Sequence, residues 1–227
     1  MELGSIASTI VCMDADLDKA IPKIANAAFR KAGQVCTSVQ RLYVERPVFD
    51  VVAKRLADAA AAFQAGDPRD QATRVGPLIT EAAARRAVDW IQEAVAAGAQ
   101  LLCGGQRDGS VVQPSVLIRG SAQTNVWCAE AFAPLISLEP FDTLEEAVAG
   151  ANSTPFGLSA GVFTSNLSKA FAATQMLRFG TVQINETSSA RSDVMPFGGV
   201  KDSGFGKEGP WHAMREMTEE RLVIFNP

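Results

Sequence analysis

The chain has 227 residues, of which 47% are hydrophobic and 20% charged. This composition excludes disorder as the bulk state and suits one large domain or two small ones. Its 25 acidic and 21 basic residues give a net charge of −4. Since no basic block stands out, we expect no nucleic-acid partner, and the short, interrupted apolar stretches predict no membrane-spanning helix.

The cysteines and the single histidine bear on metal binding and on the cellular compartment. Four cysteines, at positions 12, 36, 103 and 128, are widely spaced, and the only histidine is His212. These scattered residues lack the clustering of a zinc site, so no metal is expected. Free thiols without a recognisable signal peptide predict a reducing, cytoplasmic setting.

Strand-like and helix-like segments alternate along the chain. Strands are expected at 8–13, 40–45, 101–103, 115–118, 135–141, 159–164 and 181–185, and helices at 16–31, 48–63, 80–97, 143–151 and 167–179. The expected N-caps are Asp14 or Asp16, Thr80, and Thr143, the last with Glu146 at capping-box spacing. This alternation predicts a layered α/β fold with a mainly parallel sheet.

The last thirty residues have a different character. Residues 196–209 carry five glycines in fourteen positions, which predicts a loop whose backbone turns tightly or closely approaches another group. A short helix is expected at 211–217, followed by a hydrophobic strand at 222–225. A hydrophobic strand at a chain end often pairs with another chain, so this strand suggests a contact between copies.

One thiol is a candidate nucleophile. Cys36 lies in Gly33-Gln34-Val35-Cys36-Thr37-Ser38, between an amphipathic helix and a strand. Backbone N–H groups in such a turn lower a thiol pKa and hold an oxyanion. The alternative is a small buried hydrophobic residue, the usual state of a free cysteine.

The other polar candidates are weaker when each is taken alone. Glu2 is either a general base beside a thiol or a solvated residue, and Glu130 is either a ligand contact or a surface glutamate. Arg191 lies in a polar loop and is either solvated or a partner for an anionic group. His212, beside Trp211, fits a surface or packing position. Taken without any resemblance to known proteins, these residues predict an α/β domain with one candidate nucleophilic thiol and no specific function.

Six segments, in this order, resemble motifs of the aldehyde dehydrogenase superfamily. Glu2-Leu3-Gly4-Ser5 is similar to the ELGG segment, and the segment around Cys36 is similar to GQxC. The other four are 130–134, 152–163, 180–185 and 196–204, which resemble E-x-F-G-P, N-x-x-x-[YF]-G-L-x-x-x-[VIL]-F, G-x-[VI]-x-[VI]-N and PFGG-x-K-x-SG. Ser5 and Ala133 replace family glycines, and neither change removes a reacting group.

The resemblance implies a function and a set of site residues. The fold it implies is a three-layer α/β domain, with a mostly parallel twisted sheet and helices on both faces. The reaction it implies is oxidation of a small-molecule aldehyde to a carboxylate with NAD or NADP. Cys36 would be the nucleophile and Glu2 the general base, Glu130 and Phe132 would contact the cofactor, and Asn185 and Arg191 would belong to the substrate site.

The resemblance also bears on domain organisation. Family members are about twice this length, and their cofactor-binding half precedes the ELGG segment. The sequence therefore predicts the C-terminal catalytic half of a longer enzyme, with a catalytic domain at 1–209 and an oligomerisation arm at 210–227. Relatives are dimers or tetramers, so we expect a homo-oligomer formed through the terminal strand.

Two alternatives keep the fold and change the function. Without a cofactor-binding half, the isolated chain would be a slow thiol esterase or catalytically silent. The chain would otherwise be a non-enzymatic interaction module built around the strand at 222–225. We expect the chain alone to be unable to transfer a hydride.

Overall fold

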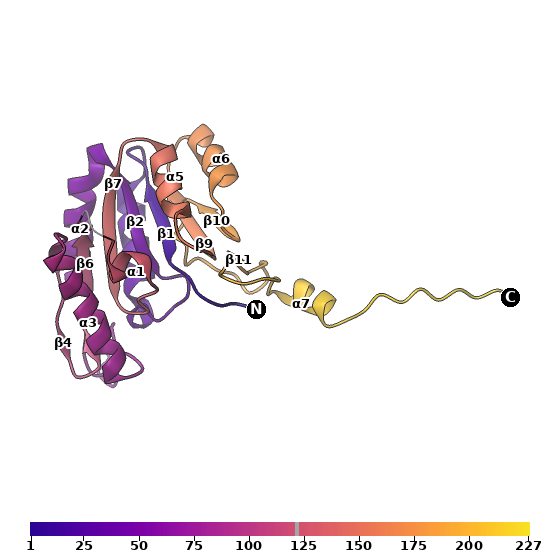
Figure 1. Ribbon diagram of the computed structural model, residues 1–227, viewed down its shortest axis with the longest axis horizontal. Helices are drawn as coiled ribbons and strands as arrows, with labels where there is room; N and C mark the ends of the chain where they lie inside the picture. Colours follow the sequence, from indigo (N-terminus) through magenta and orange to yellow (C-terminus); the bar gives the residue numbers. More distant parts are fainter. Residues whose placement is uncertain (121–122) are drawn as a thin grey trace.

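The computed structural model describes residues 1–120 and 123–227. Its centre is a seven-stranded sheet in the order β10-β9-β1-β2-β7-β6-β3 (Figure 1). The strands are β1 (Ala7–Val11), β2 (Val39–Glu45), β3 (Gln100–Cys103), β6 (Ser115–Ile118), β7 (Leu135–Phe141), β9 (Ser159–Phe163) and β10 (Thr181–Ile184). Every neighbouring pair is parallel except β3 and β6, so the predicted mainly parallel sheet is confirmed.

Helices cover both faces of this sheet (Figure 1). On one face α1 (Leu17–Phe29) and α2 (Phe49–Ala61) pack on β2, β7 and β6, and α3 (Glu81–Ala96) joins the same core. On the other face lie α5 (Leu144–Asn152) and α6 (Leu167–Met176). The predicted three-layer α/β class is therefore confirmed.

The central strands explain why a layer forms on each face. Leu42 and Val44 of β2 point into the core with α1 and α2, whereas Tyr43 points into the core with α5. Successive side chains of a strand face opposite sides of the sheet, so an unbroken apolar strand needs cover on both.

The expected helix caps form with one refinement. Asp16, rather than Asp14, caps α1 by accepting from the Lys19 N–H, and Asp14 instead accepts from the Thr164 hydroxyl. Thr80 caps α3 and Thr143 caps α5. The predicted helix at 167–179 ends early, at Met176, and the chain turns to extended backbone at Leu177.

Several small elements were absent from the prediction. They are α4 (Asn125–Cys128), the hairpin of β4 (Arg107–Asp108) with β5 (Val111–Val112), and the antiparallel pair of β8 (Phe156–Gly157) with β11 (Val200–Lys201). Each is two to four residues long, too short for hydrophobic periodicity to reveal.

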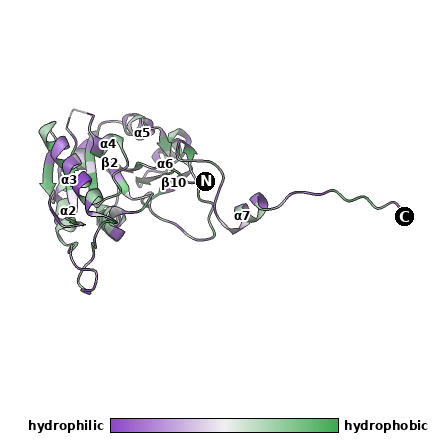
Figure 2. Cartoon of the chain, turned by 60° about the horizontal axis from the view of Figure 1, so that its bottom comes forward, coloured by the Kyte–Doolittle hydropathy of each residue, from purple (hydrophilic) through white to green (hydrophobic). Residues whose placement is uncertain are grey.

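The C-terminal segment departs from its prediction. The short helix is present as α7 (Pro210–Glu216), but 218–227 has no strand and extends away from the domain (Figures 1 and 2). The expected strand at 222–225 is wrong for the single chain, since these residues pair with no strand of the described chain. The side chains there are open to solvent: Leu222 is 85% exposed and Phe225 is 86% exposed. A strand needs a hydrogen-bonded neighbour. Within residues 1–120 and 123–227, no helix combines the length and apolarity needed to cross a membrane.

Candidate active site

The candidate nucleophile follows an unusual turn. After α1 the chain enters a short helical turn, η1 (Arg30–Gly33), in which Lys31, Ala32 and Gly33 all have φ between 52° and 66°. Left-handed backbone is strained for residues that carry a Cβ. The turn reverses the chain and presents Cys36 at the entrance to β2, with the thiol half-buried.

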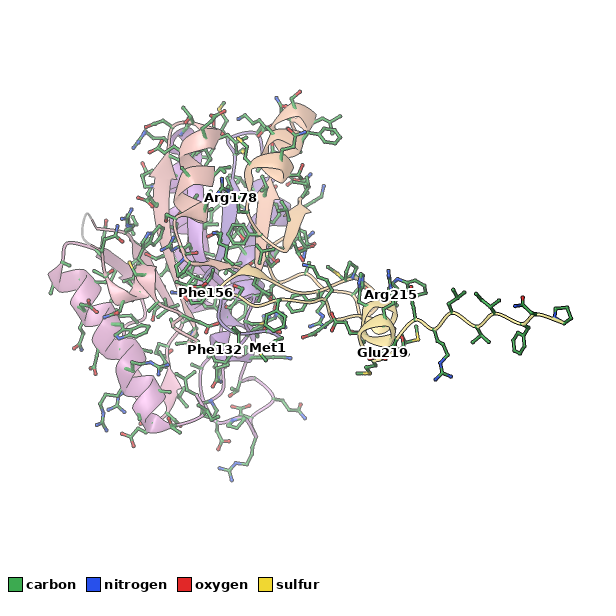
Figure 3. The ribbon with its side chains drawn as sticks, turned by 45° about the vertical axis from the view of Figure 1, so that its right-hand side comes forward. Met1, Phe132, Phe156, Arg178, Arg215 and Glu219 are labelled. Carbon is green, nitrogen blue, oxygen red and sulfur yellow. The ribbon has the colours of Figure 1, made fainter. Side chains whose placement is uncertain are left out.

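The candidate residues meet at the amino ends of three adjacent parallel strands. Glu2 and Ser5 precede β1, Cys36 precedes β2, and Glu130 with Phe132 precedes β7. The order β1-β2-β7 is that of neighbours in the sheet. Segments that are distant in sequence therefore converge at one edge (Figure 3, near Met1 and Phe132).

The Glu2 carboxylate lies close enough to the Cys36 thiol to affect its pKa. Burial, the hydrogen bond to Glu2 and the negative charges of Glu2 and Glu130 raise the pKa of Cys36 from 9.0 to about 12. The Thr37 backbone N–H donates to the sulfur and acts in the opposite direction. With its pKa raised this far the thiol is protonated at neutral pH, and moving or neutralising Glu2 removes only the part of the rise that Glu2 causes.

Glu130 forms the second carboxylate of the site. Burial raises its pKa, the backbone N–H of Ser5 lowers it, and Glu2 raises it. Glu130 and Phe132 line one small cavity with Cys36, and Phe132 has a φ of 50° that turns its ring outward, where it is 41% exposed. These two residues therefore share one cavity with the thiol.

Gln40 is a positioning residue that sequence reasoning missed. Its side chain is buried and holds the segment before Glu130, donating to Val126 O at 2.9 Å and Ala129 O at 2.7 Å and accepting from the Ala131 N–H at 3.0 Å. The sequence could not reveal this role of Gln40, because the segment that it binds is some ninety residues away in sequence.

An open cleft of about 520 Å³ adjoins the thiol on the other side. Its walls include Cys36, Thr37, Arg30, Lys31 and Arg191. The lining therefore carries three cationic side chains next to one thiol. A cluster of this kind attracts an anionic group.

Two of these cations are held by neighbours. Arg30 donates to Ser189 Oγ at 2.7 Å, which fixes its guanidinium beside the cleft. Arg191 pairs with Glu208 at 2.8 Å and lies over the ring of Phe197 at 4.2 Å. Arg191 was a candidate from the sequence. Arg30 was not, because the sequence places Arg30 inside the helix expected at 16–31.

Asn185 is not brought to this edge. It follows β10 and lies at the carboxyl ends of the parallel strands, where its side chain accepts from the Thr164 N–H at 3.0 Å. It lines a different cavity, with Lys23 and Phe163. Asn185 and Cys36 thus line different cavities, and the predicted role of Asn185 in the substrate site stays a prediction.

The site has the groups for acyl chemistry on sulfur. A thiol, a carboxylate in contact with it, and backbone N–H groups in the same turn are the parts of covalent catalysis through a thioester. Among the described residues, no three side chains of His, Cys, Asp or Glu cluster as a metal site would require.

Comparison with known proteins adds the family. The model of the aldehyde dehydrogenase family matches residues 1–223. The chain belongs to the aldehyde dehydrogenase family. The match covers nearly the whole chain and includes the segment around Cys36.

Individual aldehyde dehydrogenases resemble the chain over its whole length. It is 40% identical to a 3-sulfolactaldehyde dehydrogenase of Priestia aryabhattai, over 100% of the chain and 47% of that protein. It is 39% identical to the succinate-semialdehyde dehydrogenase [NADP(+)] GabD of Escherichia coli, over 98% of the chain and 47% of that protein. The chain thus spans about half the length of these aldehyde dehydrogenases.

Solved aldehyde dehydrogenase structures share the fold. Aldehyde dehydrogenase 21 of Physcomitrella patens, in complex with the reaction product succinate, superposes with a TM-score of 0.93 at 39% identity, over 96% of this chain and 46% of that one. Glyceraldehyde-3-phosphate dehydrogenase of Methanocaldococcus jannaschii, complexed with NADP, superposes with a TM-score of 0.91 at 38% identity, over 95% and 47%.

Proposed function

We propose that the chain is the C-terminal, thiol-bearing half of a longer NAD(P)-dependent aldehyde dehydrogenase, with Cys36 as nucleophile and Glu2 as general base. The observation that carries this proposal is the convergence of Glu2, Cys36 and Glu130 at the amino ends of three adjacent parallel strands. Glu2 is close enough to the thiol there to raise the pKa of Cys36. The half-length coverage of the relatives supports the division into two halves.

The first step is addition of Cys36 to the aldehyde. The thiol releases its proton to solvent, and the thiolate sulfur attacks the carbonyl carbon to give a thiohemiacetal oxyanion. Backbone N–H groups around Cys36 and Thr37 stabilise this oxyanion. The cleft beside Cys36 is the approach for the aldehyde.

NAD or NADP, when bound, would supply the acceptor for the hydride of the thiohemiacetal carbon, so that a thioester would remain on Cys36. The residues of this chain that would hold the cofactor are Glu130 and Phe132. Their fit rests on position, since both line one cavity with Cys36, and on the buried carboxylate of Glu130, an acceptor for ribose hydroxyls.

The second half-reaction is hydrolysis of the thioester. Glu2 takes a proton from water, the hydroxide attacks the acyl carbon, and the Cys36 thiolate leaves as the carboxylate product forms. Without a cofactor-binding half, the chain by itself would perform only this hydrolytic chemistry, as a slow esterase.

We propose an aldehyde with an anionic group as the substrate class. Arg30, Lys31 and Arg191 line the cleft beside Cys36, so an anion at the far end of a short aldehyde meets positive charge while its carbonyl meets the thiol. Two relatives are named for sulfolactaldehyde and succinate semialdehyde, both anionic aldehydes, and this supports the same class.

The test uses the natural protein that carries this chain, with succinate semialdehyde and NAD or NADP. We expect Cys36→Ser to abolish formation of reduced cofactor and Cys128→Ser, which changes an exposed thiol, to leave it intact. Oxidation retained by Cys36→Ser would reject the assignment.

We also propose a homo-oligomer in a reducing compartment such as the cytoplasm. All four cysteines are free thiols, and the exposed apolar segment at 222–225 suits addition to a sheet edge of a second copy.

A further inference from the structure

The glycine-dense loop near the C-terminus contains a serine that is completely buried. Ser203 has 0% exposure and lies in 196–209, a segment that the proposed reaction does not use. Its hydroxyl joins two other segments, donating to Gly4 O at 2.7 Å and accepting from the Gly157 N–H at 2.9 Å. Ser203 therefore connects its loop to the segment that carries Glu2.

The contacts of this loop lie on both sides of Glu2. The Leu3 N–H donates to Ser203 O at 3.1 Å, and the Phe205 N–H donates to Met1 O at 3.2 Å. Glu2 itself forms an antiparallel bridge with Gly204. Residues 1–4 are thus held as a short extended segment along 203–205, and the direction of the Glu2 side chain follows from that pairing.

The loop is itself firmly anchored. The Lys201 ammonium donates to the carbonyl oxygens of Asn152, Thr154 and Phe156 at 3.0–3.1 Å. β11, which contains Lys201, pairs with β8. Figure 3 places Phe156 beside this loop, near Met1. The loop that carries Ser203 is therefore held in place by these bonds. Through its own hydrogen bond to Gly4, Ser203 in turn fixes the position of the Glu2 segment.

We propose that Ser203 is the positioning residue for Glu2 and thereby governs both the reactivity of the Cys36 thiol and the rate of thioester hydrolysis. This inference rests on the proposed function. Removing the hydroxyl leaves Gly4 O and the Gly157 N–H without their partner, and loosens the Glu2 segment. Glu2 then moves away from the thiol, which lowers the pKa of Cys36, and away from the water that it must activate.

The substitution should speed alkylation of Cys36 and slow hydrolysis of the thioester. These opposite changes distinguish a positioning role of Ser203 from a general loss of structure. In Ser203→Ala we expect alkylation of Cys36 by iodoacetamide at pH 8 to become about threefold faster, because more thiolate is present but each thiolate is less nucleophilic. We expect hydrolysis of the acetyl-enzyme to become about tenfold slower, because its base is displaced.

Both quantities are measurable on this chain without a cofactor. 4-Nitrophenyl acetate gives a burst of 4-nitrophenolate as Cys36 is acetylated, then a steady state set by attack of water on the thioester. Alkylation is followed by mass spectrometry of the peptide that contains Cys36, since the exposed Cys128 also reacts with iodoacetamide. A protein that has lost its fold would be slow in acetylation and in hydrolysis alike.

Ser115→Ala is the matched control. Ser115 is also 0% exposed, and its hydroxyl donates to Gln113 O at 2.7 Å and accepts from the Gly105 N–H at 2.9 Å. It has the same bonding as Ser203 but joins a different pair of segments. We expect a similar loss of thermal stability and unchanged alkylation and hydrolysis. Ser203→Cys keeps a weak hydrogen-bond donor, so its alkylation and hydrolysis rates should lie between those of the wild type and Ser203→Ala. This variant tests the proposal if Ser203→Ala does not fold.

A double-mutant cycle decides the question. If Ser203 acts through Glu2, Ser203→Ala adds no further change to Glu2→Gln in either assay. The inference is overturned if Ser203→Ala changes neither rate, slows both, or has the same effect in the Glu2→Gln background. Failure of the proposed function is recognised separately, because Cys36→Ser would then hydrolyse the ester like the wild type, while the alkylation results still test the link from Ser203 to Glu2.

Discussion

The carbonyl oxygen of Ala133 occupies the space that a side chain at Gly33 would need. An ideal Cβ on Gly33 would lie 2.1 Å from Ala133 O, and the φ of Gly33 is +66°. Gly33 belongs to the turn before Cys36, and Ala133 follows Glu130 and Phe132. The close backbone approach thus brings the thiol and the second carboxylate to one cavity.

The first prediction follows from this approach. We expect Gly33→Ala to lower the free energy of unfolding by at least about 3 kcal/mol, because it combines overpacking with left-handed strain. Gly109→Ala is the control, since Gly109 has a φ of +54° but nothing within 4 Å of its Cβ position. It should cost about 1 kcal/mol. Equal losses in urea unfolding would show that the Ala133 contact does not matter.

The second prediction concerns pH. The pKa of Cys36 is raised to about 12, so its alkylation rate should keep rising beyond pH 10 without a plateau. Removing the Glu2 charge lowers that pKa, since an anion disfavours a neighbouring thiolate. We expect Glu2→Gln to accelerate alkylation at pH 8 by about threefold per unit of pKa lowered. A slower reaction would mean that Glu2 activates the thiol.

The third prediction concerns a buried arginine outside the site. Arg41 is 2% exposed, donates to Trp127 O through Nε at 2.7 Å, and lies over the Trp127 ring at 4.6 Å. Arg41→Met leaves buried acceptors without donors, which should lower the melting temperature by about 5–15 °C. Arg46→Met is the control: Arg46 pairs with Asp142 on the surface, and its loss should cost under about 1 kcal/mol. Similar shifts for both would refute the prediction.

The fourth prediction tests the substrate class. In the natural protein that carries this chain, we expect Arg191→Ala to raise KM for succinate semialdehyde about tenfold, the usual effect of removing a charged hydrogen bond, and to change KM for propionaldehyde little. Because Arg191 also pairs with Glu208, Glu208→Ala serves as the control for loss of that pair. Equal effects of Arg191→Ala on both aldehydes would exclude an anion contact.

The fifth prediction concerns the C-terminal tail. Residues 218–227 are exposed and extend away from the domain (Figure 1), so their deletion should leave the melting temperature of the domain unchanged. If 222–225 pairs with a second copy, the deletion should reduce the assembly mass measured by light scattering. An unchanged mass would remove the tail from the interface.

Much of the fold was predictable because local patterns agree with the tertiary structure. The strand at 135–141 has the predicted bounds of β7, and Thr80 and Thr143 cap their helices as expected. Hydrophobic spacing and helix capping depend on residues a few positions apart, so both can be predicted from a single sequence. Cys36 and Glu2 were also candidates through motif resemblance, and the structure places them at the amino ends of adjacent strands, while their catalytic roles stay predictions.

Other features depend on groups that are distant in sequence. Gln40, Arg30 and Ser203 acquire their partners only when strands and loops come together, and Asn185 lies at the far edge because β10 runs parallel to β1 and β9. The sequence by itself determined the alternation of elements, the caps at Thr80 and Thr143 and the candidate thiol. Only the tertiary structure decided which carboxylate faces that thiol, which cations line its cleft and which loop holds its base, because sheet order and register bring these groups together.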